Sequence, residues 1–364
     1  MGRFRTLLIR AMLFAPLFVT AAGPIPASAP PPRIASADLD GAQPVSIMTY
    51  NVEGLPWPIR FGRTTAAREI GDRLAALRRE GVQPHILVLQ EAFGAEQKAI
   101  GERAGYRYRV DGPGEADRNP AAMAAETPAD RAYLAHAHRL RGEGWGKWAG
   151  SGLVLYSDYP ILAVRSTVFP DYACAGFDCL ANKGALMAVV AVPGSPQPVA
   201  VVATHLNSKT ASGVGKARYT YAFSRQMDVL GGFLREALPA GVPYVIAGDT
   251  NVGAGATRAG LFGTMVASLP RTGAPGGNAL TTCLAPGSTC RVDTPDEARR
   301  SHEKGKDLEV YGSGTAVRLQ PVTVSVPFGH GPDGSMLSDH IGYAVGYAMM
   351  RDDEAGSAKE RPHA

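Results

Sequence analysis

Side chains able to do chemistry follow the ends of several predicted strands. Asp249 and Asn251 come after the run 243–246, whose β-branched and aromatic residues predict a buried strand. A carboxylate and an amide two positions apart at the end of a rigid strand can point into one cleft. There one could orient a water molecule and the other could contact a phosphate oxygen. Glycine, aspartate and asparagine are also common turn residues, so this motif alone is more typical of a plain turn.

Other predicted strands end in residues of the same kind. A carboxylate just beyond a buried strand is costly unless it is paired, hydrogen-bonded or bound to a metal ion. Glu91, which follows the apolar run 85–89, therefore suits a hard cation such as Mg²⁺, or else the N-terminus of a following helix. The strand-end residues are Asn51, Glu91, His205, Asp249 with Asn251, and Asp339 with His340, and Asp307 begins a further strand.

This set of carboxylates, imidazoles and amides indicates one kind of chemistry. The sequence has no serine or cysteine in a recognisable nucleophile elbow. The set instead suits metal-assisted hydrolysis of a phosphate ester. His205 can donate to a phosphate oxygen or to a leaving group. Lys183, at the entrance of another predicted strand, either meets a phosphate as a point charge or is an exposed turn lysine.

The elements that must position these residues alternate between strand-like and helix-like segments. This alternation indicates an α/β fold, and the chain is long enough for one large domain. Apolar residues at helical spacing predict helices over 63–80 and 216–238. Two stretches lack such periodicity and predict loops, namely 111–144, rich in alanine, glycine and proline, and the glycine-rich 253–300.

The first 29 residues have the layout of a secretory signal peptide, with an uncleaved membrane anchor as the alternative. A basic start precedes an apolar run over 6–22 and small residues that suit cleavage. Residues 30–44 predict a Pro/Ala-rich linker and 351–364 a charged tail. Removing 1–29, with three arginines and no acidic residue, lowers the formal net charge from +4 to +1. The mature chain is therefore predicted to be secreted or periplasmic, and its charge argues against binding nucleic acid by bulk electrostatics.

Four cysteines in an exported chain predict disulfide bonds, because such a chain meets an oxidising compartment. Three pairings are possible. Each of the local pairs, Cys174–Cys179 and Cys283–Cys290, flanks a short turn-rich stretch, which favours this pairing. The spacing lacks paired C-x-x-C motifs, and this argues against a zinc site.

Five short motifs occur in an order that resembles the endonuclease/exonuclease/phosphatase superfamily. They are Thr49-Tyr50-Asn51, Leu89-Gln90-Glu91, Thr204-His205-Leu206, Gly248-Asp249-Thr250-Asn251 and Ser338-Asp339-His340. The resemblance covers nearly the whole mature chain and implies a catalytic domain over 45–350. The fold that it implies is a four-layer α/β sandwich, in which two packed mixed β-sheets are flanked by helices.

The resemblance also implies a metal site. Glu91 would bind Mg²⁺, or another divalent cation, with Asn51 beside it. Asp339 would either bind the metal or support its ligands. Some relatives place a second cation near the residue that corresponds to His340, which would make His340 a ligand as well.

The remaining residues would carry the hydrolysis. The resemblance implies that Asp249 orients or activates the attacking water and that Asn251 contacts the phosphate. His205 would stabilise the phosphoryl oxygens or protonate the leaving group. His340, oriented by Asp307, would be the general base for in-line attack of water on phosphorus.

Within the superfamily the chain is most similar to secreted bacterial sphingomyelinase C-like phosphodiesterases. The similarity rests on the leader, on Asn182-Lys183-Gly184 after a cysteine-containing loop, and on the Gly248–Val252 ending. It implies a phospholipid substrate and transient contact with a membrane surface, for which Phe328 is the nearest candidate insertion residue. A nuclease or small-molecule phosphatase with the same site is one alternative, although the near-neutral charge makes nucleic acid the less favoured partner. A non-enzymatic binding module on the same fold is the other.

Overall fold

A computed structural model describes residues 43–55, 59–270 and 276–351. The predicted signal peptide, nearly all of the predicted linker and the tail beyond residue 351 lie outside the described residues. None of the helices in the described part combines the length and the apolar composition needed to cross a membrane.

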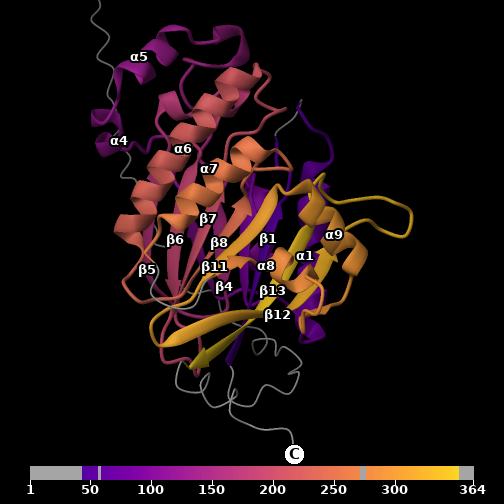
Figure 1. The fold of residues 1–364 in the computed structure, drawn as a ribbon. Helices are drawn as coiled ribbons and strands as arrows, with labels where there is room; N and C mark the ends of the chain where they lie inside the picture. Colours follow the sequence, from indigo (N-terminus) through magenta and orange to yellow (C-terminus); the bar gives the residue numbers. More distant parts are fainter. Residues whose placement is uncertain (1–42, 56–58, 271–275, 352–364) are drawn as a thin grey trace, which may run out of the picture.

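The described chain forms two mixed β-sheets (Figure 1). The first has the strand order β10-β12-β13-β1-β2-β4-β3 and contains a parallel pair, β1 with β2, at its centre. Its strands are β1 (Gln43–Asn51), β2 (Ile86–Gln90), β3 (Tyr108–Asp111), β4 (Val154–Ser157), β10 (Arg291–Val292), β12 (Val317–Phe328) and β13 (Gly342–Arg351).

The second sheet has the strand order β5-β6-β7-β8-β11-β9, with β7 and β8 parallel and the other neighbours antiparallel. Its strands are β5 (Ile161–Val168), β6 (Gly184–Val190), β7 (Val199–His205), β8 (Tyr244–Asp249), β9 (Gly277–Asn278) and β11 (Asp307–Gly312). Each sheet therefore has a parallel pair at its centre, and Asn51, Glu91, His205 and Asp249 lie at the ends of these four strands. Asp339 and His340 instead precede β13, which is antiparallel to β1.

Helices cover the outer face of each sheet. Helices α1 (Arg63–Arg79) and α3 (Ile100–Arg103), with the adjoining α2 (Ala95–Lys98), pack on the first sheet. Helices α6 (Lys216–Ala237) and α7 (Ala256–Ala267) pack on the second, as Figure 1 shows. The order helices, sheet, sheet, helices confirms the predicted four-layer α/β sandwich.

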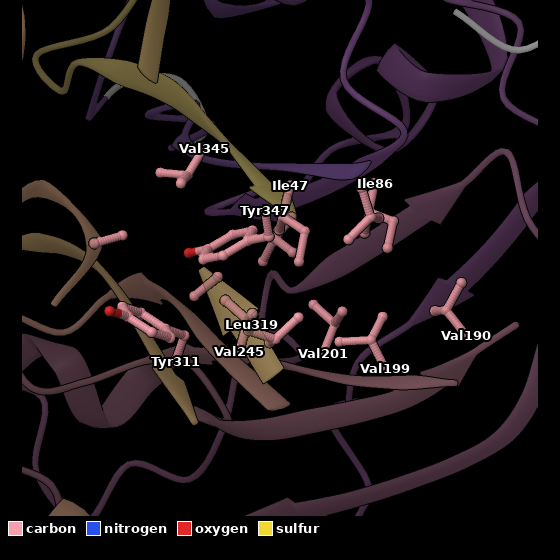
Figure 2. Packing of buried hydrophobic residues seen from close by; sticks show 14 of the residues in the cluster. Ile47, Ile86, Val190, Val199, Val201, Val245, Tyr311, Leu319, Val345 and Tyr347 are labelled. Atoms are coloured by element: carbon pink, nitrogen blue, oxygen red, sulfur yellow. The ribbon is translucent and has the colours of Figure 1, made fainter. Parts of the chain in front are cut away.

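Alternating side chains of the central strands build two cores at once. In β2, Ile86 and Val88 point into the space between the sheets, whereas Leu87 and Leu89 pack under α1. Figure 2 shows Ile86, Val201 and other aliphatic side chains meeting between the two sheets. Because both faces are covered, these strands are nearly continuous apolar runs, which is why the sequence identified them.

The two stretches predicted as loops contain helices, so that prediction was wrong. Within 111–144 lie α4 (Pro120–Ala124) and α5 (Pro128–Ala135), the latter started by a capping box between Thr127 and Asp130. Within 253–300 lie α7, α8 (Ala279–Leu284) and the first part of α9 (Pro295–Lys304). Most of these helices have ten residues or fewer. Helices this short are marginal on their own, so their sequences give only a weak signal.

Two local predictions have opposite outcomes. The disulfide bonds Cys174–Cys179 and Cys283–Cys290 are both present, with Cα–Cα separations of 5.2 and 5.0 Å. Phe328, in contrast, is only 2 % exposed. Its ring stacks on Tyr50 with a centroid separation of 4.9 Å. Phe328 is therefore a core residue at the end of β12, and the prediction that it inserts into a membrane was wrong.

A buried ion pair fixes the end of α1 to the first sheet. Arg78 of α1 donates through Nη2 to Asp158, in the turn after β4, with both side chains buried. Its Nε donates to the carbonyl of Ala104 at 2.9 Å. The guanidinium therefore joins three segments beneath the sheet.

The Asp158→Ala variant should be strongly destabilised, because it leaves the Arg78 guanidinium buried without its carboxylate. Removing one partner of a buried ion pair costs about 3–5 kcal/mol, and we expect the free energy of unfolding, measured in urea, to fall by that amount. Asp72→Ala is the control, since it removes the partner of Arg103 from an exposed pair, where the expected loss is below about 1 kcal/mol. Equal losses in the two variants would contradict the role given to Arg78.

Candidate active site

The predicted site residues converge where the central strands of the two sheets end. Asn51 is paired in register with Gln90 in the parallel β1–β2 pair, and His205 with Asp249 in the parallel β7–β8 pair. Asp307 begins β11 directly opposite Asp249. Because parallel strands place their carboxyl ends at one edge, side chains far apart in sequence meet there.

Backbone strain is concentrated at this edge. Three non-glycine residues in the described part of the chain have a positive φ, namely Glu53 at 50°, Glu91 at 56° and Asn251 at 49°. Left-handed backbone costs about 1–3 kcal/mol at a non-glycine residue and is typical of functional sites. Each of these residues lies just past a strand, and the turn at that point directs the side chain of Glu91 toward Asn51.

Asn51 bridges two buried carboxylates. Its Nδ2 donates to Glu91 Oε1 at 2.9 Å and to Asp249 Oδ2 at 3.1 Å. Its Oδ1 accepts from the backbone N–H of Glu53 at 3.0 Å, so the amide presents its donor, not its oxygen, to the carboxylates. Burial raises the pKa of both Glu91 and Asp249, because it removes the water that would solvate their charges.

Two groups of side chains have the spacing needed to hold a metal ion. Glu91, His205 and Asp249 form one, and Asp249, Asp307 and His340 form the other, with ligand atoms within 4.8 Å of one another. Glu91 Oε2 is buried without a hydrogen-bond partner among the described residues. A buried carboxylate oxygen with an unused lone pair fits a hard cation such as Mg²⁺, so the donor set suits the predicted metal.

His340 and Asp307 form a tightly held pair. The Nδ1 of His340 lies 2.8 Å from Asp307 Oδ2, and its Nε2 lies 3.7 Å from Asp249 Oδ2. Burial alone would lower the pKa of His340, but the charges of Asp307 and Asp249 outweigh it and raise the pKa to about 10. Asp307 therefore orients the ring, and the other ring nitrogen faces the buried carboxylates.

His205 lies between a lysine and the carboxylates. Lys183 Nζ is 3.1 Å from His205 Nε2, which is 3.5 Å from Asp249 Oδ2. Burial and the Lys183 charge lower the pKa of His205 well below its ordinary value. An ammonium group can only donate, so Nε2 of the neutral ring is the acceptor. Lys183 itself is buried, so the alternative of an exposed turn lysine was wrong.

Asp178 is a site residue that the sequence reasoning missed. It accepts from Lys183 Nζ and from the backbone N–H of Ser208, both at 2.6 Å. It lies within the Cys174–Cys179 loop, which the sequence gave no reason to place beside Lys183. An aspartate five residues before a lysine forms no sequence motif that would identify it as a site residue.

Arg258 is a second such residue. Its Nη1 donates to the carbonyls of Asn207 and Asn251 at 2.6 and 2.8 Å, and so joins the ends of β7 and β8. Asn251 in turn donates through Nδ2 to the carbonyl of Leu206 at 3.1 Å. Arg258 belongs to α7, in a stretch predicted as a loop, so its position could not be inferred.

Asp339 is set apart from the other predicted ligands. Its side chain is 54 % exposed, and its Oδ1 lies 3.8 Å from His340 Nε2. It belongs to neither of the groups with metal-ligand spacing. Of the two roles predicted for Asp339, support of the site at its rim therefore has more structural basis than direct ligation.

The chain belongs to the Endonuclease/Exonuclease/phosphatase family, whose family model matches residues 48–341. Members of this family are hydrolases that act on phosphoester bonds. No curated protein sequence matches the chain.

Three solved structures illustrate the fold that the chain shares. Sphingomyelinase C from Streptomyces griseocarneus is 22 % identical and has a TM-score of 0.52, over 83 % of this chain and 99 % of that one. Beta toxin from Staphylococcus aureus, as a mutant with bound magnesium ions, is 17 % identical with a TM-score of 0.52, over 84 % and 99 %. TDP2 from D. rerio, in complex with a single-strand DNA product, is 16 % identical with a TM-score of 0.52, over 84 % and 98 %. At these identities the likeness concerns the fold alone.

The stability of the metal-free protein should depend on the protonation of His340. Its pKa in the folded state, about 10, lies above the unfolded value of about 6.5. Protonation therefore stabilises the fold fully below about pH 6.5, and this stability is lost as the pH rises through 10. In EDTA, we expect the free energy of unfolding of the wild type to fall between about pH 7 and pH 10 more steeply than that of His340→Gln. Parallel curves for the two proteins would contradict this account.

Proposed function

We propose that this chain is a secreted, Mg²⁺-dependent phosphodiesterase that hydrolyses a phospholipid headgroup ester, in the manner of sphingomyelinase C. The observation that carries the proposal is the buried pair of carboxylates, Glu91 and Asp249, facing the His340–Asp307 pair across a few ångströms. We also propose a catalytic domain over 45–350, following a cleaved signal peptide. The two disulfide bonds support an oxidising compartment.

Glu91 and Asp249 would hold the metal, with Asn51 between them. The Nδ2 group of Asn51 donates to both carboxylates and would orient them around the ion. When bound, Mg²⁺ would supply positive charge that stabilises the negative charge developing on the phosphoryl oxygens. Asp339, at the rim, would support the site through His340 rather than as a ligand.

The chain's own residues would position the ester and move the protons. Asn251 would contact the phosphate oxygens, with His205 beside them. Lys183 would attract the phosphate through its charge, since its N–H groups already donate to Asp178, His205 and the Leu206 carbonyl. Asp249 would orient a water whose oxygen forms a bond to phosphorus while the ester bond opposite breaks. His340 would accept the proton of that water at Nε2. The charge of Asp249 favours a protonated His340, so neutralisation of that carboxylate would favour the free base.

A phospholipid is favoured over the other esters by two observations. The fold is shared with sphingomyelinase C, and the mature chain is nearly neutral, which disfavours a DNA backbone as the ligand. The nuclease alternative draws its support from the equal likeness to TDP2, a protein solved with a DNA product. A binding module on the same fold is disfavoured, since every predicted catalytic position holds a residue of the required type.

Removal of the metal should abolish activity. We expect the mature protein to release phosphocholine from sphingomyelin vesicles in Mg²⁺ and not in EDTA, while plasmid DNA in the same buffer stays intact. Phosphocholine can be measured enzymatically and DNA on a gel. Cut DNA with untouched vesicles would assign the same residues to a nuclease instead. Inactivity on both substrates would overturn the phosphodiesterase proposal for these two classes of ester.

The Glu91→Gln variant tests whether the charge of Glu91 is needed to bind the metal. Glutamine keeps the size and the bond to Asn51 but removes the charge, so we expect turnover to fall by at least about a hundredfold, with a higher Mg²⁺ requirement. Asp339→Asn is the matched control at the rim, and it should retain activity within about tenfold, below the range for lost ligands. If Asp339→Asn is the more damaging change, the metal site has been placed wrongly.

A further inference from the structure

A cluster of large apolar side chains lies exposed beside the site. Leu140, Trp145, Trp148 and Phe177 are 92 %, 51 %, 60 % and 43 % exposed. The two indole rings stack with their centroids 5.5 Å apart. Large apolar side chains exposed close together on a globular protein are typical of an interaction site.

The segment that carries these side chains is firmly anchored. Glu143, which is buried, accepts from the backbone N–H groups of His138 and Gly176 at 2.6 and 2.7 Å. The same carboxylate is paired with Arg218 of α6. The buried hydrogen bonds of Glu143 therefore fix the segment whose apolar side chains are exposed to solvent.

The cluster adjoins the proposed phosphate-binding side of the site. Phe177 directly precedes Asp178, which holds Lys183 at 2.6 Å. The backbone N–H of Trp148 donates to Leu180 in the same loop at 2.7 Å. A binding partner that contacts Phe177 and Trp148 would therefore lie next to the loop that leads to Lys183.

Charge and side-chain type indicate the partner. Arg139 and Arg141 flank Leu140, are exposed, and form no ion pair within the described ranges, and Arg141 lies over the Phe177 ring. Tryptophan rings beside cationic residues suit the boundary between headgroups and acyl chains, where phosphates meet hydrocarbon. Stacked aromatics also suit single-stranded nucleic acid, but an almost fully exposed leucine between two arginines has no role in base stacking.

We propose that Arg139, Leu140, Arg141, Trp145, Trp148 and Phe177 form a docking patch that seats the protein on a phospholipid bilayer. The docking patch rests on the proposed function and extends it, because it names the surface that would bind the membrane containing the substrate. After β1, Ile59 and Phe61 are also exposed, on either side of Arg60, which pairs with Glu53 at 2.7 Å.

Binding to vesicles can be measured apart from catalysis. The mature protein is mixed with phosphatidylcholine–phosphatidylglycerol vesicles in EDTA, and the bound fraction is measured by sedimentation. We expect the double variant Trp145→Ser/Trp148→Ser to lower the partition coefficient by about tenfold or more, since binding scales with buried apolar area. Leu162→Ser is the matched control. Leu162 is equally exposed, at 60 %, but lies at the end of β5 remote from the Val168–Gly184 pair.

The outcomes separate docking from the proposed function. If the wild type stays in the supernatant, or if Leu162→Ser is as damaging as the tryptophan variant, the docking patch is overturned. A change of oligomeric state on gel filtration, or lost binding of a single-stranded oligonucleotide, with vesicle binding unchanged would assign the patch to a second copy or to nucleic acid instead. Vesicle binding without phospholipid hydrolysis in Mg²⁺ would leave the patch and remove the proposed substrate. Equal hydrolysis of vesicles by the wild type and the tryptophan variant would support the proposed substrate and overturn the docking patch.

Discussion

Two carboxylates held side by side out of water constrain everything around them. Burial makes Glu91 and Asp249 costly to ionise, and a neighbouring carboxylate adds to the cost in each case, Asp249 for Glu91 and Asp307 for Asp249. The surrounding residues offset this cost. Asn51 donates to both, and Lys183 and His340 bring positive charge close by. The donor set of the site therefore fits a cation.

The layered fold is what brings this arrangement together. Two sheets, each with a parallel pair at its centre, meet back to back, so strand ends separated by more than a hundred residues become neighbours. This part was predictable from the sequence. Buried central strands must be apolar on both faces, and the polar residue that ends each run is conspicuous for that reason. The five strand-end motifs, read in order, pointed to the right family and the right sandwich.

Other parts of the site could not be predicted, for physical reasons. Asp178 and Arg258 act through contacts with Lys183 and with backbone carbonyls, and such contacts depend on how loops pack, not on any local pattern. Helices α4, α5, α7, α8 and α9 are short and lie in stretches with many turn-forming residues, so the local sequence gives little sign of them. Tertiary packing also explains the error at Phe328. Its Gly-rich sequence context suggested exposure, but its ring stacks on Tyr50 and is buried.

The Cys174–Cys179 bond encloses Asp178, which in turn holds Lys183 next to His205. Disulfide bonds of this kind persist only in oxidising surroundings. While both sulfurs are thiols, this loop loses a covalent restraint and keeps its hydrogen bonds, among them the one from the Ser208 N–H to Asp178. The redox state of the compartment therefore influences how firmly the carboxylate that positions Lys183 is held.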